Sequence, residues 1–498
     1  MTSARITATH RDYTPWILAA LALASRVQFF GNPLLESDEG FYLLVGDHML
    51  HGALPYVDIW DRKPVGLFLL YAAMRALGGD GVLSYQLVGT GFVLATSLLI
   101  TRIAREFSTA FGALAAGAAY LIWMTWGSAM GGQAEIFYAP LVCAAALLTM
   151  RGMQATPACV SRQGALAMLL IGVAAQVKYN ALFEGMFFGC CWLFIGWRSG
   201  RRAMLVPHAA LWIFAAVLPT LLATAWYAAH GDLDAFLFAN FLSVWQRTPA
   251  TNMVLLQRLG IMVLILVPLL ACVRPFARIP DDAGATAHRF TMCWLAAAIL
   301  SVLGFGTYLE QYLLPILVPA SAAAAPLLGS TTRQRATIFL AIALLLGQAR
   351  LAFTQWLHGS RAELAQIVRH IDRSGCLYIY SGFSSIYRVS NACIPTRFAF
   401  PSHLSRVREA GATGVDPVQE VDRILNTHPP TVLVRGPYSG DENWDARAEL
   451  LHHLRLDYQL AFQGRLGTQK VEVYRLSGRL ASRQPDVSMH DMGATRPQ

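Results

Sequence analysis

Charged side chains are scarce in this sequence. Only 14% of the 498 residues are Asp, Glu, Lys or Arg, whereas 55% are hydrophobic, and apolar runs recur along most of the chain. This composition excludes a soluble globular protein and predicts a polytopic membrane protein.

Sequence motifs of several large enzyme classes are also missing. The chain has no G-x-x-x-x-G-K-[ST] phosphate loop, no G-x-G-x-x-G after a strand, no H-E-x-x-H and no G-x-S-x-G. A nucleotide site is therefore not indicated. No internal repeat of fixed period is present, which argues against a transporter built from duplicated halves.

The net charge of +9 does not indicate nucleic-acid binding, because the arginines occur in short clusters between apolar runs. Such clusters are typical of loops retained in the cytoplasm. Arg5 and Arg11 precede a first apolar run that no small-residue cleavage site closes, so we predict an uncleaved span with a cytoplasmic N-terminus. The predicted location is the bacterial cytoplasmic (inner) membrane.

About eleven transmembrane helices are predicted in residues 1–354. They are Trp16–Phe30, Val82–Ile103, Ala110–Trp126, Ile136–Met150, Gly164–Val177, Asn180–Trp197, Val206–Tyr227, Met253–Cys272, Phe290–Leu303, Gln311–Leu328 and Ala336–Phe353. Val65–Leu77 is too short to cross comfortably and is expected at the outer interface. The outer loops are then residues 31–81, 128–136 and 228–253, and the C-terminal segment is extracytoplasmic.

From about residue 355 the composition becomes that of a soluble domain. Strands are predicted within residues 376–382, 431–436, 458–464 and 471–476, and helices over Arg361–Arg373, Pro417–Asn426 and Trp444–Leu454. We predict a periplasmic α/β domain over residues 355–477 and a disordered tail over residues 478–498. Cys376 and Cys393 are the two cysteines of this segment, and their spacing leaves both a disulfide and two thiols open.

Polar residues gather in residues 31–66 of the first outer loop. Ser37 is a good N-cap, Asp38 and Glu39 fall in the first turn of a short helix, and Arg62 and Lys63 follow. Acidic residues are favoured at a helix start by the macrodipole, which offers a purely structural explanation for two of them. That explanation does not cover the charges at the end of the loop.

Further charged residues lie in the other outer loops, where Glu135 begins a span, Lys178 separates two spans, and Arg247 follows an apolar stretch. If these loops fold together, the cations can hold an anionic leaving group such as a phosphate while a carboxylate accepts a proton from an attacking hydroxyl. Asp38 and Glu39 are about 100° apart on a helix, so only one of them is expected to be the base.

Four stretches give the sequence a family resemblance: SDEGFYLLVGDHMLHGALPYVDIWDRKP, the G-x-x-E loop of residues 132–135, QVKYNAL and YLEQYLLPILVP. In this order they resemble the C-type (GT-C) integral-membrane glycosyltransferases. More specifically, they resemble the protein O-mannosyltransferase and lipid A aminoarabinose transferase group, which is glycosyltransferase family 39-like. The resemblance covers roughly the first 350 residues.

The resemblance implies inverting transfer of a sugar from a polyprenyl-phosphate donor to an extracytoplasmic acceptor, which is a lipid A or lipopolysaccharide, another glycan, or a protein. By position it implies Asp38 as the catalytic carboxylate, Lys63, Lys178 and Arg247 for the donor phosphate, and Tyr308 or Tyr312 in the pocket. The charges of the outer loops add Glu39 and Glu135 as catalytic candidates and Arg62 as a phosphate-binding candidate. A divalent metal, if one is used, would be bound by Asp38 and Glu135. The family often has Lys-Pro-Pro where this chain has Lys63-Pro64-Val65, and an aspartate where it has Glu135.

Alternative roles exist for these residues and for the chain. Lys63 and Lys178 could be interface lysines whose ammonium groups extend toward water, and Arg247 could pair with Asp232 or Asp234. The chain as a whole could be a transporter or flippase for a lipid-linked or anionic substrate. A receptor or assembly protein that works through its C-terminal segment is a third reading.

Overall fold

The computed structural model describes residues 12–127, 131–153, 160–200, 202–438 and 440–478. The predicted disordered tail, apart from Gly478, and residues 128–130 of the second outer loop lie outside these ranges. The chain divides into two compact units. Unit 1 comprises residues 1–39, 63–233 and 250–354, and unit 2 comprises residues 40–62, 234–249 and 355–498.

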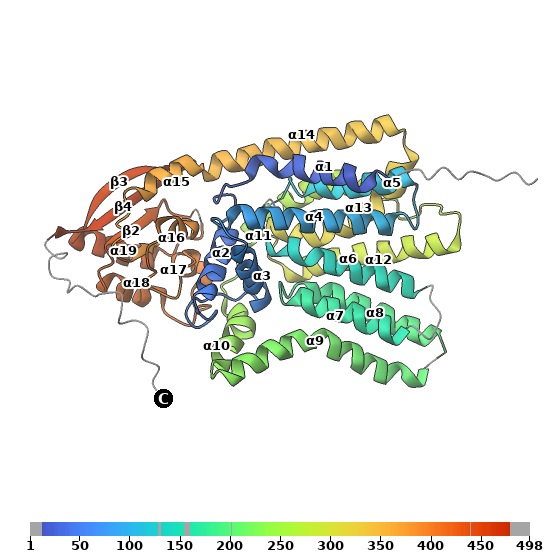
Figure 1. Cartoon of the computed structure of the whole chain (residues 1–498), viewed down its shortest axis with the longest axis horizontal. Coiled ribbons are helices and arrows are strands. Elements are labelled where there is room, and N and C mark those ends of the chain that lie inside the picture. Colours follow the sequence, from blue (N-terminus) through green and yellow to red (C-terminus); the bar gives the residue numbers. More distant parts are fainter. Residues whose placement is uncertain (1–11, 128–130, 154–159, 201, 439, 479–498) are drawn as a thin grey trace, which may run out of the picture. The chain divides into compact units, whose positions relative to one another are not determined.

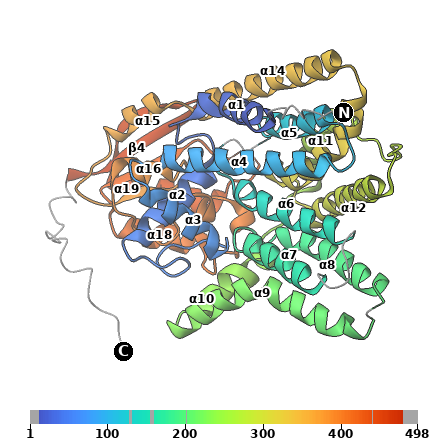
Figure 2. The same ribbon diagram turned by 45° about the vertical axis from the view of Figure 1, so that its right-hand side comes forward.

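Unit 1 is built from helices, and α4 lies beside α1, α5, α6 and α13 (Figures 1 and 2). Its α-helices are α1 Thr14–Arg26, α3 Val65–Ala76, α4 Val82–Ala104, α5 Ala110–Trp123, α6 Ala134–Gly152, α7 Val160–Ala175, α8 Ala181–Arg198, α9 Leu205–Ala229, α11 Asn252–Leu270, α12 Asp282–Phe305, α13 Leu314–Ser330 and α14 Arg333–His358, the last of which runs on into unit 2. Three short 3₁₀ turns adjoin them, at Val27–Phe29, Arg202–Met204 and Glu310–Leu313.

Each of the eleven predicted spans overlaps one of these helices, although several helices begin earlier or end later than predicted. Within the described residues, seven helical segments are long and apolar enough to cross a membrane by length and composition, and three shorter apolar helices accompany them. The helical, polytopic fold class is therefore confirmed, while the number of crossings stays a prediction.

Small residues let the helices of unit 1 approach closely. A Cβ on Gly112 of α5 would lie 2.5 Å from the carbonyl oxygen of Ala325 and 2.9 Å from Cα of Gly329, both on α13. Inside a membrane the hydrophobic effect does not drive helices together, so they associate through van der Waals contacts, which small residues make possible. The glycines therefore set the spacing between α5 and α13.

Unit 2 contains a four-stranded sheet in the order β1-β2-β4-β3. The strands are β1 Leu377–Ile379, β2 Thr431–Arg435, β3 Tyr458–Leu466 and β4 Gln469–Leu476, and the helices are α10 Leu233–Leu237, which starts one residue before the unit, α15 Arg361–Val368, α16 Ser385–Ser390, α17 Ser402–Ser405, α18 Pro417–Asn426 and α19 Trp444–Asp457. Strand β1 pairs with β2 in parallel, and β4 pairs antiparallel with both β2 and β3. The predicted strands and helices of this segment are present.

Local sequence explains these elements. The central strand β2 is buried over its first four residues, as expected for a run of β-branched and leucine residues inside a sheet. Helix α18 begins where the Asp416 side chain accepts hydrogen bonds from the backbone N–H groups of Val418 and Gln419, with Pro417 in the first turn. In α15, Ser360 and Glu363 form a reciprocal capping box.

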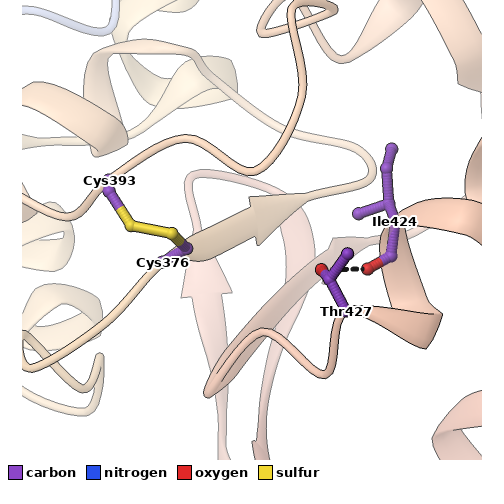
Figure 3. The surroundings of a disulfide bond; sticks show 4 residues. All are labelled: Cys376, Cys393, Ile424 and Thr427. Carbon is purple, nitrogen blue, oxygen red and sulfur yellow. Dashed lines mark hydrogen bonds between the residues drawn. A yellow bond between two sulfur atoms is a disulfide. The ribbon is translucent and has the colours of Figure 1, made fainter. Parts of the chain in front are cut away.

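Cys376 and Cys393 form a disulfide bond at the beginning of β1 (Figure 3). Their backbones also form an isolated parallel bridge. The bond closes a loop over a sequence separation of 17 residues, and α16 lies within that loop.

The compact unit that contains the sheet is larger than the predicted domain of residues 355–477. Trp60 from the first loop is 2% exposed and belongs to the hydrophobic core of this unit, and its backbone N–H donates to Arg397 at 2.9 Å. Phe41 packs on Phe400 with 5.1 Å between ring centroids. These apolar contacts bring residues 40–62 into the unit, so helix α2, Ser37–Leu50, passes from one unit to the other after Glu39.

Candidate active site

Glu39 holds the backbone of the second loop in unit 1. Its side chain is fully buried, and its Oε1 accepts a hydrogen bond of 2.5 Å from the backbone N–H of Gly132. The Arg26 guanidinium donates to the Gly131 carbonyl at 2.8 Å, and the Tyr71 hydroxyl donates to the Gly132 carbonyl at 2.6 Å. A Cβ on Gly131 would overlap the Glu39 carboxylate, so this close approach requires glycine. Glu39 therefore positions the loop that leads into α6.

Burial also changes the acidity of this part of the first loop. It raises the pKa of Glu39 to about 7, although the Gly132 N–H and the charge of Arg26 act in the opposite direction. Burial likewise raises the pKa of Glu36 well above its ordinary value, and the carboxylates of Glu39 and Asp38 add to the effect. The beginning of α2 thus has one fully buried carboxyl group, Glu39, next to the partly exposed Glu36 and Asp38.

Glu135 and Lys178 form an ion pair inside unit 1. Glu135 lies in the first turn of α6 and is 1% exposed, and Lys178 lies between α7 and α8 and is 7% exposed. The Lys178 ammonium also lies 4.4 Å from the centre of the Tyr312 ring. A carboxylate and an aromatic face thus fix the position of one ammonium group.

Asp38 is close enough to act electrostatically on this pair. Burial disfavours the charged form of Lys178, but Glu135, Tyr312 and Asp38 outweigh it and raise the pKa of Lys178 above its ordinary value. The Asp38 side chain is partly exposed, whereas those of Glu39 and Glu135 are buried. Of the three predicted catalytic carboxylates, Asp38 is therefore the one with access to solvent.

The segments that carry Lys63 and Lys178 lie side by side. Lys63 and Pro64 immediately precede α3, and the backbone N–H of Leu67 in its first turn donates to the Gln176 carbonyl at 3.1 Å. Gly66 allows this approach, since a Cβ there would lie 2.6 Å from the same carbonyl oxygen. Gln176 is two residues before Lys178, so two predicted phosphate-binding lysines come from adjacent segments of unit 1.

Two buried oxygen atoms near this pair make no hydrogen bond among the described residues. They are Oε2 of Glu135 and the hydroxyl of Tyr138, one turn further along α6. Buried polar atoms are usually hydrogen-bonded, and exceptions concentrate where a ligand or water completes the set. Glu135 and Tyr138 are three residues apart on α6 and therefore lie on the same face of that helix.

Arg62 and Arg247 belong to unit 2 and share one carboxylate there. Arg62 Nη2 lies 2.5 Å from Glu409 Oε2, and Arg247 Nη2 lies 2.5 Å from Glu409 Oε1. Burial opposes ionisation of Glu409, but the two guanidinium groups outweigh it and lower the pKa of Glu409 below its ordinary value. Among the ion pairs of the described residues, Arg247 therefore has Glu409 as its partner and not Asp232 or Asp234.

The remaining predicted residues are placed as follows. Tyr308 has a left-handed backbone with φ of 48°, and its hydroxyl donates to the Leu303 carbonyl at 3.4 Å. A divalent metal bound by Asp38 and Glu135 stays a prediction. Within the described chain, the one group with three suitable ligand atoms inside 4.8 Å is Asp422, Glu449 and His453, on α18 and α19.

No protein-family model and no curated protein sequence matches the chain. Among solved structures, the chain is similar to ArnT from Cupriavidus metallidurans in the apo state, with a TM-score of 0.61 and 15% sequence identity, over 92% of this chain and 98% of ArnT. The chain has the GT-C fold.

Two further GT-C structures show weaker similarity. The arabinofuranosyltransferase AftD from Mycobacteria gives a TM-score of 0.47 at 14% identity, over 93% of this chain and 41% of AftD. An Archaeoglobus fulgidus oligosaccharyltransferase tethered to an acceptor peptide gives 0.45 at 11% identity, over 86% of this chain and 69% of that one. The predicted resemblance to GT-C proteins is confirmed at the level of the fold.

Several residues that contact the candidate residues within unit 1 or within unit 2 were not predicted from the sequence. Arg26 was assigned to the first span, and Tyr138 and Glu409 were not singled out. Neither was Tyr85, whose side chain forms a hydrogen bond with Glu39. An arginine at the end of a span is a weak signal, because such residues usually extend toward water. Glu409 lies in a segment rich in charge, where nothing local distinguishes it from its neighbours.

Proposed function

We propose that the chain is an inverting glycosyltransferase that moves a sugar from a polyprenyl-phosphate donor to the hydroxyl of an extracytoplasmic acceptor. The observation that carries this proposal is the arrangement at the beginning of α2 and α6, where Asp38 acts on a Lys178 ammonium that Glu135 and Tyr312 hold. The GT-C fold supports it, since that fold occurs in the glycosyltransferase ArnT.

Asp38 is the proposed general base. Glu39 is occupied by the Gly132 backbone, and Glu135 is occupied by Lys178. Asp38 accepts the proton of the acceptor hydroxyl, the hydroxyl oxygen forms a bond to the anomeric carbon, and the bond from that carbon to the phosphate oxygen breaks. The sugar configuration inverts because attack and departure occur on opposite faces.

Lys178 and Lys63 are proposed to bind the donor phosphate and to stabilise the negative charge that it gains as it leaves. An ammonium has three N–H donors, so Lys178 can contact a phosphate while it keeps its bond to Glu135. A polyprenyl phosphate leaves as a stable anion and needs no separate general acid. Glu135 and Tyr312 are positioning residues in this scheme.

The proposed location is a bacterial cytoplasmic (inner) membrane with the N-terminus in the cytoplasm. The Cys376–Cys393 disulfide supports an oxidising compartment for unit 2, since disulfides persist outside the cytosol. A lipid-linked donor suits such a site because nucleotide sugars are confined to the cytoplasm. The acceptor is a glycan, a lipid or a protein.

The proposal is tested by measuring release of polyprenyl phosphate from a panel of polyprenyl-phosphate sugars in isolated membranes. Asp38→Asn is compared with the wild type and with Asp47→Asn, which makes the same change on the same helix. We expect Asp38→Asn to lower the rate by roughly 10²–10⁴-fold, the usual contribution of a general base, and Asp47→Asn to remain close to the wild type.

Activity of Asp38→Asn equal to that of the wild type, at matched expression, would show that another group is the base. If neither protein consumes any donor, with plausible acceptors added, the transferase proposal fails. Transport of the intact lipid-linked sugar would then be the reaction to measure.

A further inference from the structure

Helices α18 and α19 of unit 2 pack against each other through the hydrophobic core of that unit. Val421 and Leu425 of α18 belong to the same buried cluster as Leu450 and Leu454 of α19. Such close-packed side chains have little freedom to move. The core therefore fixes the separation of the polar side chains that lie at the edge of the contact.

His453 lies at this edge and has carboxylates at both of its ring nitrogens. Its Nε2 lies 2.9 Å from Oδ1 of Asp422 on α18 and 3.5 Å from Oε1 of Glu449, one turn earlier on α19. Its Nδ1 lies 3.6 Å from Oδ2 of Asp457, one turn later on α19. Residues 449, 453 and 457 are spaced by four, so they follow one another along one side of α19.

The three carboxylates have no lysine or arginine to balance them. Among the ion pairs of the described residues, each of them pairs with His453 and with no other basic side chain. Arg423, the residue after Asp422, binds Glu420 instead. Even a protonated imidazole would leave the group with an excess of negative charge. Carboxylates that converge in this way provide the charge that a bound metal cation needs.

The His453 side chain is oriented as that of a metal ligand is. It is 9% exposed, and its Nδ1 is buried and makes no hydrogen bond among the described residues. In metal sites, the ring nitrogen that does not bind the ion usually faces a carboxylate, a carbonyl or a water, which fixes the ring. Asp457 has this position relative to Nδ1, so Nε2 is directed toward Asp422 and Glu449.

The distances and the donor atoms fit a first-row metal ion. Asp422, Glu449 and His453 each offer one ligand atom, and these atoms all lie within 4.8 Å of one another. Around a tetrahedral zinc ion with bonds of about 2.0–2.1 Å, neighbouring ligand atoms are roughly 3.3 Å apart. The 2.9 Å and 3.5 Å distances lie on either side of that value. Magnesium and calcium prefer oxygen ligands alone, whereas an imidazole with carboxylates suits zinc.

We propose that His453, Asp422 and Glu449 bind a divalent first-row metal ion such as zinc, and that Asp457 orients the imidazole. The ion takes the place of the hydrogen between Nε2 and Asp422. The Asp422 and Glu449 side chains are 48% and 30% exposed, so solvent reaches the ion and water completes its coordination. The bound ion links α18 to α19 and stabilises unit 2. This site does not depend on the transferase activity proposed above.

The test is zinc binding to the purified full-length protein, stripped of metal by a chelator and measured by calorimetry and thermal unfolding. We expect zinc to raise the unfolding temperature of the wild type. Asp422→Asn with Glu449→Gln removes two ligands and should weaken binding at this site by at least the roughly 10–100-fold that loss of an outer partner costs. Asp445→Asn, at an exposed position of α19 outside the group, is the matched control and should bind as the wild type does.

The comparison between variants separates this site from other zinc ligands and from loss of structure. Zinc bound elsewhere, for example by the exposed thiols Cys190 and Cys293, is common to all variants. Without zinc, the double variant should unfold close to the wild type, because both changes keep the size of the side chain and remove like charges. Equal zinc affinity and equal zinc-induced stabilisation of the wild type and the double variant would overturn the proposal.

Two further measurements test the roles of Asp457 and of the imidazole. Asp457→Asn keeps all three ligand atoms and should weaken zinc binding roughly 10–100-fold, as expected for a residue that orients a ligand. Unchanged affinity would remove that role. Magnesium should bind more weakly than zinc, because it disfavours a nitrogen ligand. Equal affinity for the two ions would overturn the assignment of His453 as a ligand.

Discussion

At the scale of single residues, the three predicted carboxylates have different environments although two of them are neighbours in sequence. Glu39 is buried against a backbone N–H, Glu135 is buried against an ammonium, and Asp38 is partly exposed. A helix turns by about 100° per residue, so Asp38 and Glu39 necessarily point in different directions. This separation lets Glu39 hold the second loop while Asp38 remains available for its proposed role as the base.

Glu39→Gln is expected to change how stability depends on pH. The raised pKa means that the folded protein retains a proton which the unfolded chain, with a value near 4.5, has already released. Stability from this group is therefore greatest at low pH and falls as the pH rises from 4.5 to about 7, by on the order of 3 kcal/mol. Glutamine stays uncharged, so the stability of the variant should not fall in this way as the pH rises.

The measurement is the difference in unfolding temperature between Glu39→Gln and the wild type in detergent at pH 5 and at pH 8. We expect the variant to gain stability relative to the wild type at the higher pH. A difference that does not change with pH would mean that Glu39 is not protonated preferentially in the folded state.

At the scale of elements, glycines decide how closely the helices of unit 1 pack. The contact between Gly112 on α5 and residues 325–329 on α13 leaves no room for a side chain. By contrast, a Cβ at Gly91 on α4 meets nothing within 4 Å. Two glycines in neighbouring helices therefore have different structural importance.

Gly112→Leu should push α5 away from α13 and destabilise unit 1 by about 1–3 kcal/mol, the usual cost of overpacking. Gly91→Leu introduces the same side chain into open space and should leave stability almost unchanged. Unfolding temperature and expression level in membranes measure both effects. Equal behaviour of the two variants would mean that the α5–α13 contact does not limit the packing.

At the scale of the whole molecule, the chain crosses between its two units several times. Residues 40–62 and 234–249 leave unit 1 and return to it, and the segment from residue 355 completes unit 2. Unit 2 therefore needs three separate segments of chain, and its stability depends on contacts between them as well as on its sheet.

Removing the disulfide should destabilise unit 2. Replacing Cys376 and Cys393 with serine opens a loop of 17 residues, for which the chain-entropy model gives a loss of about 3 kcal/mol. Limited proteolysis of the C-terminal segment measures the effect, and reductant should make the wild type resemble the variant. The control is a variant in which the exposed free cysteines Cys190 and Cys293 are replaced with serine. If reductant does not change the proteolysis of the wild type, the prediction is contradicted.

Part of the candidate site could be read from composition. Of the 39 lysines and arginines, only Lys63, Lys178 and Lys470 are lysines, and two of these three lie in adjacent segments of the candidate site. The positions of Asp38 and Glu135 at helix starts also follow from local sequence. Partners such as Gly132 for Glu39, 93 residues apart, could not be predicted because no local signal encodes them.

The sequence by itself determined where the helices and strands lie, because the length of an apolar run and the period of its side chains are local properties. Tertiary structure alone decided that Arg62 and Arg247 meet at Glu409, across 347 and 162 residues. It also decided that Trp60 belongs to the core of unit 2. Such contacts depend on which distant surfaces pack together, and packing is a property of the folded chain rather than of any one segment.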